Sequence, residues 1–432
     1  MMDFIKRQPA VRIIAVGFLL VILLGSLLLS LPCSVREGVE LKYVDALYTA
    51  VSAVCVTGLA TVDVANTFTP IGQTFLALLI QTGGLGITSV GAGVILIVGK
   101  KMDLKSRNLI RESMNFDSGR GVIRFLKSVF YTTLVIEAMG AVLNFFVFIK
   151  DFPFWRAVGL SVFHSISAFN NAGFDLLGNF ESLSRYYGNV YFNIVTCALI
   201  FFGGIGFLVI KEVIAKRFRW KKFSMHSKVV LTMSAILITV GTLLFKLTED
   251  VTWLGAFFAS VSARTAGFAT VSLGDFSSAG LIIMIALMFI GASPGSTGGG
   301  IKTSTFFVLA QGIRSSATNK SERAFKYTIP KDAFKKAAVI ALFALSVVFI
   351  STVAVCILEP ELALSDVLFE MASAMGTVGL STGITPSLSA ASKIITMLVM
   401  YIGRLGAWTI VTLWSFSREE RISYPEGNIA IG

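Results

Sequence analysis

The sequence has little charge: Asp, Glu, Lys and Arg make up 14% of its 432 residues, against about 25% in an average soluble domain. It has only two histidines and four cysteines, and neither type is spaced like the ligands of a metal site. No Ser/His/Asp or Cys/His combination stands in register for nucleophilic catalysis. These shortages argue against an ordinary soluble domain, a catalytic metal and an enzyme.

Apolar residues take the place of charged ones. They make up 55% of the chain, and the mean hydropathy is +0.79. A stretch of about 20 apolar residues is long enough to cross a bilayer, and eight such stretches begin near Val11, Ile71, Phe125, Val190, Val229, Leu281, Ala333 and Lys393. The composition therefore predicts an all-α integral membrane protein with eight transmembrane spans.

The formal net charge of +12 comes from particular loops rather than from one domain. Most Lys and Arg residues lie at the two termini and in the segments 100–127, 211–228 and 314–336. Because cytoplasmic loops carry the excess of Lys and Arg, we expect both termini and these segments on the cytoplasmic side of the cell membrane. The basic charge thus follows membrane topology, and no nucleic-acid partner is predicted.

A fourfold repeat runs through the chain. Each outward-facing connection carries an apolar run too short to span a membrane, at 44–54, 155–168, 253–263 and 366–375. Each run leads to a glycine, at Gly58, Gly173, Gly267 and Gly379. A Ser-Ala pair precedes this glycine at a constant distance in three repeats, and in the third it stands one residue closer.

The predicted unit is a span, a pore half-helix, a filter loop and a second span (M1-P-M2). It occurs four times, over 11–99, 125–214, 228–314 and 333–416, within a single transmembrane pore domain, 1–432. Four similar units suggest a pseudo-fourfold arrangement around a central pore.

The glycine segments have the properties of an ion filter. Non-helical backbone at membrane depth must be buried or line a water-filled cavity. Glycine permits the positive φ that lets successive carbonyls point one way, and rings of carbonyls replace the hydration shell of a monovalent cation. The alternative is that these glycines serve only close helix packing.

The second spans share a Gly-x-x-Gly motif at 83–86, 203–206 and 403–406, and the third repeat departs from it. There, Pro294 and the glycines of 291–300 cannot continue a regular helix. We expect this segment to lie across the cytoplasmic half of the pore as a flexible barrier; the alternative is a passive helix kink.

Arg404 replaces a glycine in the fourth of these motifs, at a depth where an ionisable side chain is costly. We expect it to act in gating and as an electrostatic barrier to cations. The alternative is a structural salt bridge to Glu370 or Glu137.

These residues resemble the Trk/Ktr/HKT superfamily of cation translocators, and within it the KtrB type of subunit. The M1-P-M2 units and the segments NNAGF (170–174) and RTAGF (264–268) carry the resemblance. It implies potassium uptake by a homodimer in which each protomer has its own pore. Glycine in all four filters is typical of the potassium-selective members, whereas a serine in the first filter marks sodium-selective relatives.

The resemblance also assigns residues. The filter carbonyls that would hold K⁺ belong to Val56, Thr57, Gly58, Asn171, Ala172, Gly173, Thr265, Ala266, Gly267, Thr377, Val378 and Gly379. The intramembrane gate comprises Gly291, Ala292, Ser293, Pro294, Gly295, Ser296, Thr297, Gly298, Gly299, Gly300, Lys302 and Arg404.

The partners implied by the resemblance are a cytosolic ring of KtrA-type RCK subunits that binds nucleotide (ATP or ADP), with the segments 100–127 and 211–228 as its docking surfaces. These basic segments are also suited to contact membrane lipids. Na⁺ is implied as an activator, and no covalent cofactor is expected. The alternatives are a stand-alone Trk/HKT-type Na⁺/K⁺ transporter and a secondary symporter; the parallel repeats and the scarcity of unpaired intramembrane carboxylates argue against the symporter.

Overall fold

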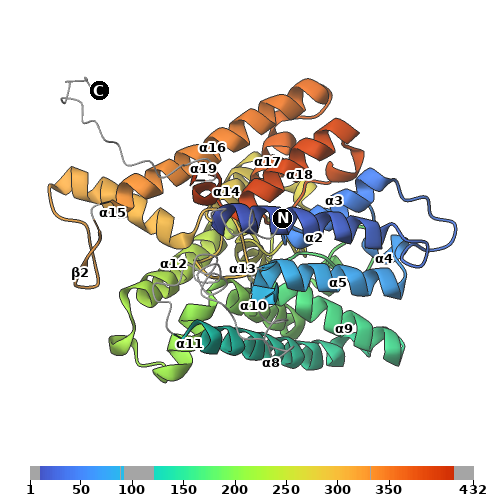
Figure 1. The fold of residues 1–432 in the computed structure, drawn as a ribbon, viewed down its shortest axis with the longest axis horizontal. Coiled ribbons are helices and arrows are strands. Elements are labelled where there is room, and N and C mark those ends of the chain that lie inside the picture. The colour runs from blue at the N-terminus through green and yellow to red at the C-terminus, as the bar shows by residue number, and fades with distance from the viewer. Residues whose placement is uncertain (1–9, 88, 92–120, 331, 413–432) are drawn as a thin grey trace, which may run out of the picture.

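The computed structural model describes residues 10–87, 89–91, 121–330 and 332–412, and almost all of its regular structure is helical (Figure 1). Its one two-stranded sheet pairs β1 (Arg323–Ala324) with β2 (Tyr327–Thr328) in antiparallel fashion. The main helices are α2 (Ala10–Leu29), α3 (Tyr43–Val54), α4 (Val64–Thr67), α5 (Pro70–Leu85), α8 (Val122–Phe148), α9 (Phe154–Phe169), α10 (Val190–Gly204), α11 (Phe207–Ala215), α12 (Met225–Thr248), α13 (Trp253–Ser262), α14 (Ser278–Phe289), α15 (Thr303–Thr318), α16 (Ala333–Leu358), α17 (Leu364–Gly376), α18 (Ala390–Leu405) and α19 (Ala407–Thr412).

Four of the described helices, α2, α8, α12 and α16, are long and apolar enough to cross a membrane. At most 39% of the most hydrophobic window in each is buried within the protein. So much exposed apolar surface is expected of helices that face lipid rather than water. Each of the four contains the start of a predicted first span.

The remaining predicted spans begin in α5, α10, α14 and α18, which are shorter. Only α10 with α11 passes the same length test as a pair, and the two helices meet at a bend of 100°. The count of eight spans therefore stays a prediction. The ends of the first and fourth predicted repeats, at 99 and 416, lie outside the described residues.

All four second helices are interrupted, whereas the sequence pattern led us to expect a break only in the third. Gly86, Gly206 and Gly406 have φ values of +82°, +90° and +86°, a conformation that is costly for any residue with a Cβ. Gly86 follows the end of α5, Gly206 lies between α10 and α11, and Gly406 lies between α18 and α19. The last glycine of each Gly-x-x-Gly motif is thus the point of interruption, and the third repeat extends this break into a long loop.

Helices form at all four short apolar runs that were predicted as pore half-helices, and these helices, α3, α9, α13 and α17, are called the pore helices below. The second helix of each repeat packs against the pore helix of the next: α5 on α9, α10 on α13, α14 on α17 and α18 on α3. Because the last of these pairs joins the fourth repeat to the first, the four units form a closed ring. Lys393 Nζ and Asp45 Oδ1, 2.8 Å apart, form an ion pair across that junction.

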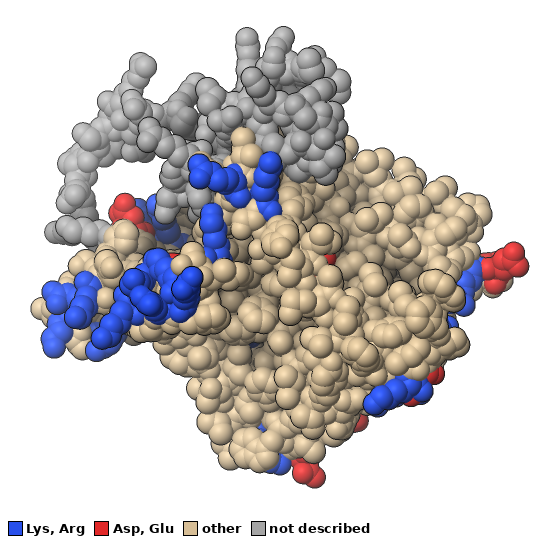
Figure 2. Space-filling model, turned by 90° about the horizontal axis from the view of Figure 1, so that it is seen from below, with Lys and Arg blue, Asp and Glu red and all other residues tan. Residues whose placement is uncertain are grey.

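Charge is distributed along the length of the molecule. In Figure 2, Lys and Arg side chains gather at the left end, where Figure 1 places α15 and the hairpin of β1 and β2. A broad uncharged band separates them from the opposite end, where both signs occur. An uncharged band between charged ends is typical of a membrane protein.

Candidate functional site

The four pore helices end in segments with the same unusual backbone. In each segment the glycine and the residue two positions before it have positive φ, while the residue between them does not. Alternation of this kind turns successive carbonyls toward one side, as a carbonyl filter needs. The φ values are +55° and +96° for Val56 and Gly58, +57° and +71° for Asn171 and Gly173, +76° and +80° for Thr265 and Gly267, and +49° and +94° for Thr377 and Gly379.

The four glycines also form a closed ring in space. A Cβ on Gly58 would stand 2.5 Å from the Ala172 carbonyl oxygen, and one on Gly173 would stand 2.9 Å from that of Ala266. In the same way Gly267 abuts the Val378 carbonyl and Gly379 abuts the Thr57 carbonyl. In each repeat, the space that a side chain would fill is occupied by a carbonyl of the next repeat, from the residue directly before that repeat's glycine. Each of the four positions therefore needs glycine.

The Ser-Ala pair of the sequence supports these segments from behind. In the first repeat, Ser52 accepts the N–H of Thr57 on its carbonyl at 2.8 Å and the N–H of Gly58 on its hydroxyl at 3.0 Å. Ser373 makes the corresponding pair of bonds in the fourth repeat, at 2.9 Å and 3.0 Å. A hydroxyl that satisfies a buried N–H contributes about 1 kcal/mol and fixes the strand.

The other two serines differ. Ser262 stands one residue closer to its glycine, and its hydroxyl donates to the Phe268 carbonyl beyond the filter. The hydroxyl of Ser167 has no hydrogen-bond partner within the described chain. The spacing difference visible in the sequence therefore corresponds to a different hydrogen bond.

The first glycine of each Gly-x-x-Gly motif has a packing role. It lies against the carbonyl four residues before the filter glycine: Gly83 against Val54, Gly203 against Phe169, and Gly403 against Met375. In the third repeat Gly291 instead abuts the carbonyl of Gly299, within its own loop. The motif thus brings the second helices close to the ends of the pore helices.

The loop between α14 and α15 is bonded to one predicted filter segment and to the end of α9. The Gly299 N–H donates to Thr377 Oγ1 at 3.0 Å, and Thr297 Oγ1 donates to the Phe169 carbonyl at 3.2 Å. Lys302 Nζ donates to the carbonyls of Gly298 at 2.7 Å and Gly299 at 3.3 Å. The predicted gate residues therefore lie against the predicted filter segment of the fourth repeat and against the end of α9 in the second repeat.

Arg404 connects this loop to the first repeat. Its guanidinium donates to the carbonyl of Thr297 in the loop and to the carbonyls of Gly83 and Gly84. Within the described chain it forms no salt bridge with Glu137 or Glu370. The position beside the loop agrees with the gating hypothesis, and the salt-bridge alternative is not observed.

A cavity of about 210 Å³ lies beside the loop and Arg404. All four repeats contribute to its wall, with Gly84, Phe207, Gly298 and Arg404 among the lining residues. Among the residues that the structure describes, the ionisable side chains that line it are Lys302 and Arg404, both basic.

A polar cluster that the sequence analysis did not assemble lies behind the second filter strand. Asn170 Nδ2 donates to Gln81 Oε1 and to Glu137 Oε1, at 2.9 Å each, and Gly84 leaves room for the Asn170 side chain. Asn170 directly precedes the filter residue Asn171, whose amide lies 3.1 Å from Thr265 Oγ1. In the sequence, this cluster is indicated only by two polar residues, Gln81 and Glu137, that stand within apolar spans.

Comparison with known proteins agrees with this geometry. Residues 10–249 and 228–422 match the TrkH family of cation transport proteins. The chain belongs to this family. It is 38% identical to the potassium/sodium uptake protein NtpJ of Enterococcus hirae, over 99% of this chain and 98% of that protein. It is also 36% identical to the Ktr system potassium uptake protein B of Bacillus subtilis, over 98% and 96% of the two chains.

The fold is that of a solved relative as well. The structure of the potassium transporter TrkH from Vibrio parahaemolyticus matches with a TM-score of 0.70 at 19% identity, covering 92% of this chain and 84% of that one. As a member of the TrkH family, this protein is a multi-pass membrane transporter and not an enzyme.

Proposed function

We propose that this protein takes up K⁺ through the ring of four filter segments, with the loop 291–302 and Arg404 as its gate. The observation that carries the proposal is the closed ring in which each filter glycine abuts the carbonyl of the next strand. NtpJ is a potassium/sodium uptake protein and the Bacillus subtilis relative is a potassium uptake protein, and both support K⁺ as the ion. Glycine in all four strands favours K⁺ over Na⁺.

The filter would act by replacing water. Carbonyl oxygens from four strands substitute for the hydration shell of K⁺, and strands locked by the bonds from Ser52 and Ser373 need little rearrangement when the ion arrives. The C-terminal ends of the four pore helices point into the filter segments, where each contributes about half a negative charge. Both effects stabilise a desolvated cation.

The gate would act by position and by charge. The loop is bonded to the fourth filter strand at Thr377, to the end of α9 at Phe169 and to Arg404, so its displacement must break several hydrogen bonds together. The positive charges of Lys302 and Arg404 oppose a cation below the filter. Conduction therefore requires the loop to move and to carry at least Lys302 away from the path.

The remaining features of the proposal concern assembly. We include eight spans in four M1-P-M2 repeats, cytoplasmic termini, a homodimer, stimulation by Na⁺ and a cytosolic nucleotide-binding KtrA-type ring. The name of the Ktr system supports a separate regulatory subunit. Of the two basic segments suggested as docking surfaces, residues 100–120 lie outside the described chain, whereas 211–228 form the basic end of α11 and the start of α12.

The test is ion uptake in a strain that lacks its own potassium transporters, with and without a Ktr-type partner. Wild type is expected to restore growth at low K⁺ and to take up K⁺ and Rb⁺ in preference to Na⁺. Arg404→Gln is expected to change the maximal rate or the apparent K⁺ affinity, whereas Lys42→Gln, an exposed charge change outside the filter, should change neither. Identical kinetics in wild type and Arg404→Gln would refute the gating role.

A second measurement separates a passive path from a symporter. In vesicles with fixed K⁺, Na⁺ and H⁺ gradients, a passive K⁺ filter has a reversal potential set by K⁺ alone. A symporter's reversal potential shifts with the gradient of the coupled ion. Preference for Na⁺ over K⁺ in the uptake assay would instead favour the Na⁺/K⁺ transporter alternative.

A further inference from the structure

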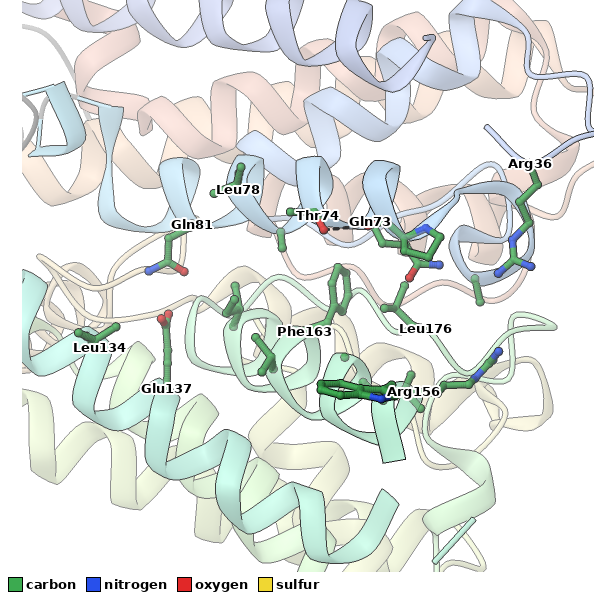
Figure 3. A pocket seen from close by; sticks show the side chains of 18 residues that line it. Arg36, Gln73, Thr74, Leu78, Gln81, Leu134, Glu137, Arg156, Phe163 and Leu176 are labelled. Atoms are coloured by element: carbon green, nitrogen blue, oxygen red, sulfur yellow. Dashed lines mark hydrogen bonds between the residues drawn. The ribbon is translucent and has the colours of Figure 1, made fainter. Parts of the chain in front are cut away.

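An open groove of about 920 Å³ runs between the first and second repeats, apart from the ion path. One wall is α5, with Leu78 and Gln81, and the other is formed by α8 and α9, with Leu134 and Phe163 (Figure 3). Most of the lining side chains are apolar. The volume lies in the range of pockets that hold small ligands, about 300 to 1,000 Å³.

The two ends of the groove have different chemistry. Arg36 and Arg156 lie at one end on opposite walls, and Gln81 and Glu137 face each other at the other end (Figure 3). Arg36 Nε donates to the Phe68 carbonyl at 3.2 Å, which leaves its terminal nitrogens available. The Arg156 guanidinium lies 5.4 Å from the centre of the Phe152 ring.

Neither arginine has an ion-pair partner in the described part of the chain. Both are exposed, and the loop after α2, which carries Arg36, lies at the end of the molecule opposite to α15 and the hairpin (Figure 1). Two guanidinium groups on opposite walls at one end of the groove favour binding of a phosphate, because each presents several N–H donors in one plane.

The length of the groove corresponds to one leaflet of a bilayer. Between Pro70, at the start of α5, and Gln81 the helix rises about 16 Å at 1.5 Å per residue. Half of a hydrocarbon core of about 30 Å is about 15 Å. An acyl chain entering beside the arginines would therefore reach the level of Gln81, where Glu137 is already bonded to Asn170.

We infer that this groove binds an anionic glycerophospholipid of the outer leaflet, with the headgroup phosphate between Arg36 and Arg156 and one acyl chain along α5 and α9. The inference rests on the proposed function only for its assignment of the outer side. A zwitterionic lipid fits less well because its headgroup brings a positive charge beside the two arginines. The bound chain would pack on the pore helix that leads into the second filter strand.

The glycine at position 159 offers a way to block the groove. It lines the groove on α9, and a Cβ placed on it would meet no atom within 4 Å. Replacement of a helical glycine by a residue with a side chain also favours the helix. Gly159→Leu should therefore fill the groove without unfolding the protein, and Gly188→Leu, at an equally open position that does not line the groove, is its control.

The experiment measures lipid retained by the purified full-length protein, by native mass spectrometry during titration with phosphatidylglycerol or phosphatidylcholine. Wild type is expected to prefer phosphatidylglycerol by about tenfold. The double variant Arg36→Gln/Arg156→Gln should lose that preference, while Lys42→Gln/Lys246→Gln, which removes the same charge elsewhere, should keep it. Gly159→Leu should reduce retention of both lipids, and Gly188→Leu should not.

Three results would overturn the inference. Equal retention of the two lipids by wild type would remove the role of the phosphate site. Displacement of phosphatidylglycerol by millimolar inorganic phosphate would indicate a site for the free anion. Loss of dimer rather than of lipid in Gly159→Leu would show that a second copy of the chain occupies the groove. Because lipid binding is measured without ion flux, failure here leaves the proposed K⁺ uptake untouched.

Discussion

The filter ring makes a sharp prediction for Gly58→Ala. The φ of +96° at this position is costly for alanine, by about 1 to 3 kcal/mol. The new Cβ would also stand 2.5 Å from the Ala172 carbonyl oxygen and 3.1 Å from Gly173 Cα. Because carbon and oxygen atoms rarely approach within 3.0 Å, the neighbouring carbonyl must move by about half an ångström.

That displacement falls on a group proposed to contact the ion. Functional sites tolerate errors of about 0.5 Å, and 1.4 kcal/mol corresponds to a factor of ten in an equilibrium. If the strain is relieved by separation of the two strands, the ratio of K⁺ to Na⁺ uptake should fall about tenfold or more. Gly58→Ser should act in the same direction.

The matched control is Gly38→Ala. Gly38 has a similar φ of +81°, but a Cβ there would meet no atom within 4 Å. This variant carries a comparable backbone penalty without touching the filter, so its selectivity should equal that of wild type. Competition of K⁺, Rb⁺ and Na⁺ for uptake, normalised to protein in the membrane, measures the effect. Unchanged selectivity in Gly58→Ala, or an equal change in Gly38→Ala, would refute the assignment of the ring as the filter.

Three further predictions concern the surroundings of the filter. Ser373→Ala leaves a filter N–H without its acceptor, at a cost of about 1 to 3 kcal/mol, and should lower K⁺/Na⁺ selectivity. The hydroxyl of Ser167 has no partner in the described chain, so Ser167→Ala should leave selectivity unchanged. Equal effects in the two variants would contradict this prediction. Glu137→Gln keeps an acceptor for Asn170 and should retain Rb⁺ uptake, while Glu137→Ala should reduce it several-fold, and the argument fails if both variants behave alike. Burial raises the pKa of Asp175, in the loop after the second filter, to about 6, so this carboxylate is charged at pH 7.5 and protonated at pH 5, and uptake at low K⁺ should fall on acidification in wild type but not in Asp175→Asn.

The positions of the pore helices could be predicted because they depend on local properties. The short apolar runs at 44–54 and 366–375 correspond to α3 (Tyr43–Val54) and α17 (Leu364–Gly376). Their length excluded a span, and the glycines after them marked the end of the helix. The sequence also shows the one-residue offset of Ser262, which corresponds in the structure to a hydrogen bond with a different partner, the Phe268 carbonyl.

Other features depend on residues far apart in the chain. Arg404 donates to the carbonyls of Thr297 and Gly83, which lie 107 and 321 residues away. Backbone carbonyls exist at every position, so a bond to one leaves no pattern in the sequence. For the same reason the sequence left open the alternative of a salt bridge to Glu137 or Glu370.

The sequence by itself determined a membrane protein of four similar units, each with a glycine after a short apolar helix, because hydrophobic length and glycine placement are properties of single segments. Tertiary structure alone decided that the glycines of four repeats abut one another's carbonyls in a closed ring. It also decided that three second helices break at the last glycine of their Gly-x-x-Gly motif, and that the third gives way to a long loop. Those facts arise from the packing of one repeat against the next, where each backbone limits the space left to its neighbour.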